Sequence, residues 1–279
     1  MFGGFFNRMY YGDPRKPELK KEDVKGSRFK LFTTVLSVRF WQLMQLNLLY
    51  SIFWIPAFLL NFAHAVRMQE TGQVISIPFF LLMIPCLMLT GPATAAVSYI
   101  IRNWARDEHA WVWSDFKDAW KENWKQGLFV MLMNGIFFLL SNIGIYFYGY
   151  RFEESGSFLF LYMKYFMFLF ILMIAMMNMF IFPMIVTYRL KLKDIIRNAF
   201  ILTMVKLPFT FLIFLFSAAW VVLSLAFLAS LPFFVVGLTF PALIILSYVN
   251  WIFDIYINNR IMEQEQEQGD ISAEQVKEV

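Results

Sequence analysis

Long stretches without charged residues alternate with polar segments along this chain. Asp, Glu, Lys and Arg are absent from 40–66, 71–101, 126–150 and 165–188, and each stretch exceeds the roughly 20 residues that a helix needs to cross a bilayer. A fifth stretch, 207–253, is about twice that length and is interrupted by a proline near its middle. We therefore predict an all-α, polytopic membrane protein with six transmembrane helices. The predicted spans are Phe40–Phe62, Ile75–Ile101, Gly127–Tyr148, Tyr165–Tyr188, Leu207–Leu228 and Phe233–Phe253.

The spans divide the chain into three parts. A basic N-terminal segment with an amphipathic stretch occupies 1–39, the six-helix transmembrane domain occupies 40–258, and an acidic tail occupies 259–279. Of the 24 Lys and Arg residues, 21 lie in the N-terminal segment, after spans two and four, or in the C-terminal part, whereas only Arg67, Arg151 and Lys164 lie on the other side. The positive-inside rule therefore predicts that both termini are cytoplasmic.

The composition supports residence in the bilayer and argues against a soluble domain and against a nucleic-acid-binding protein. Hydrophobic residues make up 59% of the 279 residues and charged residues only 16%, with 34 phenylalanines, whereas soluble domains carry about 25% charged residues. The net charge of +4 reflects basic residues that the topology already requires, so it does not indicate a nucleic-acid partner. The lipid bilayer is the partner that the sequence itself predicts.

Three segments on the predicted cytoplasmic side have helical amphipathic patterns. In 105–126, four aromatic residues recur at steps of three and four, with Ser114 as the expected N-cap and Asp115 in the first turn. This predicts a separate cytoplasmic helix whose aromatic face either lies among lipid headgroups or packs on the ends of the bundle. Segments 25–40 and 193–204 show similar patterns. The interfacial face consists of Trp113, Phe116, Trp120 and Trp124.

Span two carries small polar residues and prolines on a common strip. Such residues permit close approach of two helices, and a proline-broken helix is also typical of the substrate path of some transporters. Two asparagines in other spans supply further polar groups. Both a packing role and a neutral-solute path therefore remain open for Thr90, Gly91, Pro92, Thr94, Ala95, Ser98, Asn47 and Asn178.

The even-numbered spans share a phrase with a proline followed by a tyrosine. It reads GPATAAVSY at 91–99, FPMIVTY at 182–188 and FPALIILSY at 240–248. Because an amphipathic stretch precedes each odd-numbered span, the pattern favours a threefold repeat of helical hairpins, each with a cytoplasmic helix before it.

Catalytic and metal chemistry finds no support in the sequence. The two histidines, His64 and His109, belong to opposite faces of the bilayer, and Cys86 is the single cysteine, so the usual His/Cys zinc sets cannot form. The predicted spans contain no ionisable side chain of the kind that marks ion-coupled transport. We expect no enzyme activity, no catalytic residues, no cofactor and no metal.

Three motifs of the chain carry a resemblance to a known family: NLLYSIFWIPAFLL at 47–60, LTGPATAAVSYIIRNWAR at 89–106 and DFKDAWKENWKQG at 115–127. With these motifs the chain resembles the YesL-like family of bacterial integral membrane proteins, a domain of unknown function known from Bacillus and its relatives. The resemblance implies a multi-pass protein of the bacterial cytoplasmic membrane. Because family members are often encoded beside carbohydrate ABC-importer genes, it also implies a link to sugar uptake and importer membrane subunits as partners. It implies no chemistry and no site residue.

Two functions are compatible with these features. The favoured one is a non-catalytic accessory or scaffolding component linked to carbohydrate uptake. The alternative is a stand-alone transporter or channel for a neutral solute, which requires a path lined by residues such as Asn47, Thr94, Ser98 and Asn178.

The topology can be tested by cysteine accessibility on a Cys86-free background. A membrane-impermeant thiol reagent added from outside should modify cysteines placed at Glu70 and Ser155, and should leave those placed at His109 and Lys193 unmodified. Labelling at position 109 in intact cells would contradict the predicted orientation.

Overall fold

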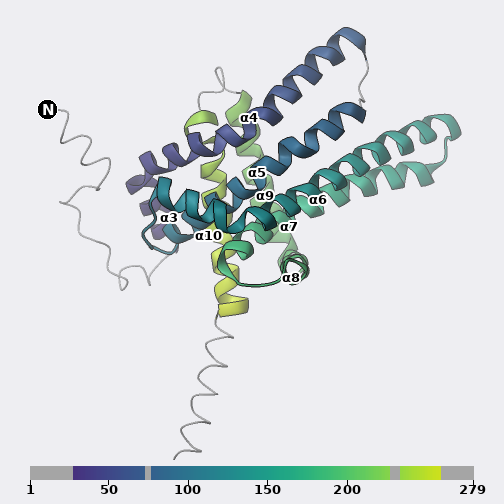
Figure 1. Ribbon diagram of the computed structural model, residues 1–279. Coiled ribbons are helices and arrows are strands. Elements are labelled where there is room, and N and C mark those ends of the chain that lie inside the picture. Colours follow the sequence, from purple (N-terminus) through teal and green to yellow (C-terminus); the bar gives the residue numbers. More distant parts are fainter. Residues whose placement is uncertain (1–27, 73–76, 227–232, 259–279) are drawn as a thin grey trace, which may run out of the picture.

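The computed structural model describes residues 28–72, 77–226 and 233–258, which form a bundle of helices (Figure 1). In this bundle the long hairpin of α6 (Val112–Ser155) and α7 (Phe158–Thr187) lies beside α4 (Phe40–Thr71) and α5 (Ile77–Trp104). The α9–α10 pair crosses these four helices steeply. The elements are α3 (Arg28–Val38), α4 (Phe40–Thr71), α5 (Ile77–Trp104), α6 (Val112–Ser155), α7 (Phe158–Thr187), α8 (Leu192–Val205), α9 (Leu207–Ala226), η2 (Phe233–Gly237), α10 (Thr239–Phe253) and η3 (Asp254–Asn258).

Six of these helical segments are long and apolar enough to cross a membrane. They are α4, α5, α6, α7, α9 and the run Phe233–Asn258. The prediction of an all-helical, polytopic membrane protein with six spans is thereby confirmed. Several helices are longer than predicted: α6 has 44 residues and extends for about 66 Å, roughly twice the thickness of the hydrocarbon layer.

The predicted separate helix in 105–126 is wrong, because most of this segment is the first part of α6. Between Val112 and Ser155 the sequence has no proline, so nothing ends the helix before the third span begins. Ser114 is not the N-cap. Trp111 precedes the helix, and its backbone N–H donates to the Asp115 carboxylate over 2.8 Å. The middle unit of the proposed repeat therefore lacks a separate first helix, whereas α3 and α8 are separate.

The residues of the predicted interfacial face lie on α6 and differ in their exposure. Phe116 is buried, and its ring centroid lies 5.9 Å from that of Phe53 on α4. Trp120 is half-buried against the same cluster, while Trp113 is 72% exposed and Trp124 is 44% exposed. One edge of this face therefore packs on the bundle and the other edge faces outward.

The backbones of α5 and α6 touch where two glycines meet. A Cβ atom added to Gly127 would lie 2.8 Å from the carbonyl carbon of Gly91 and 2.8 Å from the nitrogen of Pro92, and a Cβ added to Gly91 would collide with the Gly127 carbonyl. Real Cβ atoms do not approach so closely, so both positions require glycine. The contact brings the predicted strip on α5 directly against α6.

Side chains from α5 and α10 complete the backbone hydrogen bonding at the ends of neighbouring helices. Arg102 donates to the Val186 carbonyl over 2.7 Å, at the C-terminal end of α7, where the last carbonyls have no partner within the helix. Asn250 donates to the Arg102 carbonyl over 3.4 Å. These bonds join α5, α7 and α10 at one end of the bundle.

The same end holds the break between α3 and α4. Arg39 lies between the two helices, and its guanidinium is 5.5 Å from the centre of the Trp104 ring. Burial lowers the pKa of the Arg39 guanidinium, and nearby Asp107 opposes that lowering. We call this end, where α3, α8 and η3 lie, the basic end of the bundle.

Candidate functional site

The predicted strip on α5 faces the interior of the bundle. Thr90, Gly91, Pro92, Ala95 and Ser98 are buried, and Thr94 is half-buried. The Thr94 hydroxyl donates to the Thr90 carbonyl over 2.7 Å and lies 2.7 Å from the Tyr50 hydroxyl. Because Thr94 gives its one proton to the carbonyl, Tyr50 is the donor in the second bond.

Asn47 lies apart from the other predicted residues and holds the start of the last span. It is fully buried. Its amide nitrogen donates to the carbonyls of Phe233 and Phe234, each over 2.8 Å. Its amide oxygen accepts from the backbone N–H groups of Leu238 and Thr239, over 2.9 and 3.0 Å. One side chain of α4 thus satisfies four backbone groups around the break between η2 and α10.

This break explains why Asn47 is needed. Val236 within η2 has non-helical backbone angles (φ −146°, ψ 15°), so the helical hydrogen-bond ladder is interrupted there. The first N–H groups of α10 have no acceptor within their own helix. Their burial would cost free energy without a partner, and the Asn47 oxygen supplies it.

A cavity of about 300 Å³ is lined by residues of α4, α5, α6, α7, α9 and α10, and we call it the central cavity. Three predicted residues, Thr94, Ser98 and Asn178, line it, and Asn47 does not. Most of the remaining wall is aliphatic or aromatic. Its polar lining consists of Tyr50, Thr94, Ser98, Asn178 and Ser217.

A second cavity of about 380 Å³ adjoins the central cavity and extends between the α4–α5 and α6–α7 hairpins. Both cavities are lined by Met131, Ala175 and Asn178. At this junction the Asn134 amide donates to the Asn178 oxygen over 2.9 Å. The residues that line the two cavities carry no formal charge, so the interior is suited to neutral groups.

Sequence reasoning missed Tyr50 and Ser217, although α9 carries a signal. Thr210, Ser217 and Ser224 recur every seven residues in an otherwise apolar helix, and all three are buried. A spacing of seven places them on one face, which is the face turned toward α10 and the central cavity. The hydroxyl of Ser217 is buried without a hydrogen-bond partner.

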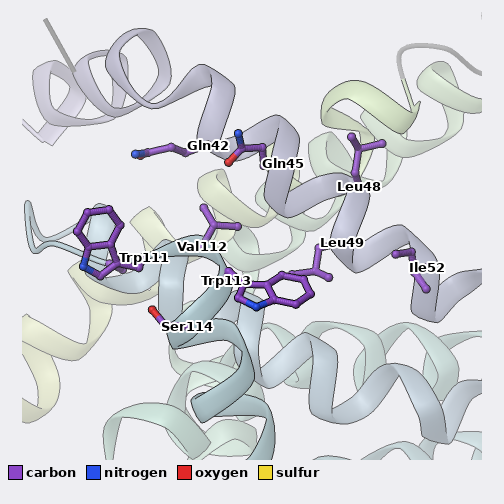
Figure 2. Close-up of a pocket in the computed structure, with 10 residues that line it drawn as sticks. Gln42, Gln45, Leu48, Leu49, Ile52, Trp111, Val112, Trp113 and Ser114 are labelled. Carbon is purple, nitrogen blue, oxygen red and sulfur yellow. The ribbon is translucent and has the colours of Figure 1, made fainter. Parts of the chain in front are cut away.

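A third hollow lies at the surface, between the first half of α4 and the start of α6, and we call it the α4–α6 groove (Figure 2). Its volume is about 740 Å³. Figure 2 shows Gln42 and Gln45 on α4 across from Trp111, Val112 and Ser114, with the Trp113 ring along the groove. Its remaining lining is mostly aliphatic: Leu48, Leu49, Ile52 and Ala110.

Comparison with known proteins gives one match, in the segment that forms the α4–α6 groove. Residues 43–145 match the family model described as "Protein of unknown function, DUF624". The segment runs from within α4 to within α6, and it contains the three motifs that carry the family resemblance. It also contains every residue that lines the groove except Gln42. No curated protein and no solved structure matches the chain.

Replacing Asn47 tests its role in holding α10. We expect Asn47→Leu to lower the free energy of unfolding by at least about 3 kcal/mol, because four buried backbone groups lose their partner. Thermal unfolding of the detergent-solubilised protein measures the change. The matched control is Asn142→Leu, since that amide donates only to the Phe138 carbonyl of its own helix. Equal melting temperatures for the two variants would contradict the proposed role.

Proposed function

We propose that this multi-pass protein is a non-catalytic accessory component of the bacterial cytoplasmic membrane, linked to carbohydrate uptake, which binds a partner membrane protein in the α4–α6 groove. The observation that carries the proposal is the groove itself. Leu48, Ile52 and Trp113 are respectively 47%, 58% and 72% exposed along it. Exposed aromatic and aliphatic side chains gathered in a concave surface are typical of sites that receive an apolar face of another protein.

The polar residues of the groove favour a protein occupant. Gln42, Gln45 and Ser114 can donate and accept directional hydrogen bonds along one side of an apolar channel. An amphipathic or transmembrane helix with small polar side chains matches such a lining. The resemblance to the YesL-like family, with its carbohydrate-importer gene neighbourhood, supports an ABC-importer membrane subunit as the partner.

Photocrosslinking from the groove tests this proposal. A photoreactive residue at Leu48 should crosslink an importer membrane subunit in intact cells. The same residue at Leu59, which is exposed on α4 outside the groove, should not. Trp113→Ser should weaken co-purification of that subunit about thirtyfold, since truncating a central interface tryptophan costs about 2 kcal/mol. Crosslinks to lipid alone from Leu48 would overturn the proposal.

A structural control separates lost binding from lost folding. Because Trp113 is largely exposed and Phe116 is buried, Trp113→Ser should leave the melting temperature nearly unchanged. Phe116→Ser should lower it clearly, because burial of an aromatic side chain contributes about 1.5–3 kcal/mol.

The two adjoining cavities favour a second candidate function, a stand-alone carrier for a neutral solute. Their uncharged lining and scattered hydroxyl and amide groups suit a hydroxylated molecule such as a sugar. Asn178 is central to this candidate because it lines both cavities.

Reconstitution of the protein alone in liposomes tests the second candidate. A carrier should take up a labelled neutral sugar, and Thr94→Phe or Asn178→Leu should reduce the rate at least tenfold by filling the cavity or removing its amide. Asn142→Leu, which lies outside both cavities, should retain the rate. Uptake with this pattern would contradict a purely accessory role, and inert liposomes together with a stoichiometric importer partner would contradict the carrier.

A further inference from the structure

The second interior cavity, which adjoins the central cavity, contains amide groups that already donate within the protein. Its volume is about 380 Å³, and we call it the second cavity. The Asn178 amide donates to the Ile174 carbonyl over 2.9 Å, and its oxygen accepts from Asn134. Asn61 donates to the Ala57 carbonyl over 2.9 Å. Because the remaining wall is apolar or aromatic, this cavity suits a hydrocarbon chain.

The central cavity, in contrast, contains hydroxyl groups without partners. Ser217 on α9 is 5% exposed, and its hydroxyl is buried without a hydrogen-bond partner. Ser98 on α5 is 6% exposed and forms no hydrogen bond with the part of the chain that the structure describes. Both side chains line the cavity. Since buried polar groups are nearly always paired, a ligand in the cavity would supply the missing partners.

A proline adds an acceptor to the same wall. Pro183 of α7 has no N–H, so the Met179 carbonyl, one turn earlier, lacks its usual helical donor. Both residues line the central cavity. Serine hydroxyls donate and accept hydrogen bonds, whereas a carbonyl only accepts them. A ligand that satisfies this wall therefore carries an O–H group, which can donate to the carbonyl and accept from a serine.

The bilayer can supply a ligand to the two adjoining cavities. Met131, Ala175 and Asn178 line both of them. Ala175 of α7 and the cavity residues Ala218 and Val221 of α9 are only half-buried. Because α7 and α9 are both long and apolar enough to cross a membrane, this side of the cavities is surrounded by hydrocarbon, from which a lipid can enter.

We propose that the two cavities together bind a neutral lipid with one acyl chain and a hydroxyl-bearing headgroup, the chemistry of a monoacylglycerol. The headgroup hydroxyls lie in the central cavity and pair with Ser98, Ser217 and the Met179 carbonyl. The acyl chain extends past Ala175 into the second cavity, where it packs on the apolar wall. The uncharged lining of both cavities disfavours a phospholipid headgroup, whose phosphate would be buried without an opposite charge.

This inference rests on neither proposed function. No described residue of the α4–α6 groove lines the two cavities, so a bound lipid leaves the groove free for a partner. A retained lipid would occupy the path of the second candidate, the carrier. Because bound lipid is measured without an uptake assay, a failure to find it would leave both proposed functions standing.

Native mass spectrometry of the full chain in nonionic detergent, after removal of co-purified lipid, tests the headgroup. We expect monooleoylglycerol to bind with an apparent affinity at least tenfold higher than methyl oleate, which has the same chain and no O–H group. It should also exceed oleoyl lysophosphatidylcholine at least tenfold, because that headgroup is charged. Equal retention of the three lipids, or no retention of monooleoylglycerol, would overturn the proposal.

Serine variants locate the headgroup. The double variant Ser98→Ala/Ser217→Ala should bind monooleoylglycerol at least tenfold more weakly, and no better than methyl oleate, since it loses both unpaired hydroxyls. Ser224→Ala is the matched control. Its hydroxyl is also buried on α9, but it donates to the Val221 carbonyl over 2.8 Å and lies outside the cavity. An unchanged preference in the double variant, or an equal loss in the control, contradicts the proposed site.

Fluorescence quenching locates the acyl chain. A monoacylglycerol brominated midway along its chain should quench Trp54, which lines the second cavity, and comparison with Trp54→Phe measures this contribution. Ala175→Phe should remove it, because a phenyl ring fills the junction of the cavities. Ala219→Phe should retain it, since Ala219 is exposed on α9 outside both cavities. Absence of Trp54 quenching in the unaltered protein, or undiminished quenching in Ala175→Phe, would refute the proposal.

Discussion

The fold depends on a constraint that every buried backbone imposes: no N–H or carbonyl group can be left without a partner away from water. In the last span the helical hydrogen bonding is interrupted at η2, which leaves backbone groups there without a partner in their own helix. Asn47 of α4 forms four hydrogen bonds with these groups. Because those bonds join residues 186 to 192 positions apart, they also fix the position of the α9–α10 pair on the first hairpin. That placement shapes the central cavity, since side chains of both α9 and α10 line it.

The spans could be predicted from the sequence because the physics of insertion acts on local composition. A helix that crosses hydrocarbon must exclude charge over about 20 residues, and the stretches without charge mark all six helices. The junction of 105–126 with the third span was harder, because an amphipathic pattern looks the same whether the helix stops or continues. Gly127 resembled a boundary, yet it serves a close contact with Gly91, and only the tertiary structure distinguishes the two roles.

The candidate site was partly predictable for a similar reason. Thr94, Ser98 and Asn178 were recognisable as polar residues in apolar helices, and all three line the central cavity. The role of Asn47 was not recognisable, since its partners are backbone groups of a distant break that no side-chain pattern records. Ser217 could have been predicted to face the interior, because it is seven residues from both Thr210 and Ser224 in an otherwise apolar helix.

The absence of charged side chains from the lining of the two interior cavities limits what these cavities can bind. The two interior cavities are lined by uncharged side chains, and an ion that entered them would lose its hydration without a countercharge, at a cost of several kcal/mol. The lining of these two cavities can therefore discriminate between neutral molecules only by shape and by its few hydroxyl and amide groups.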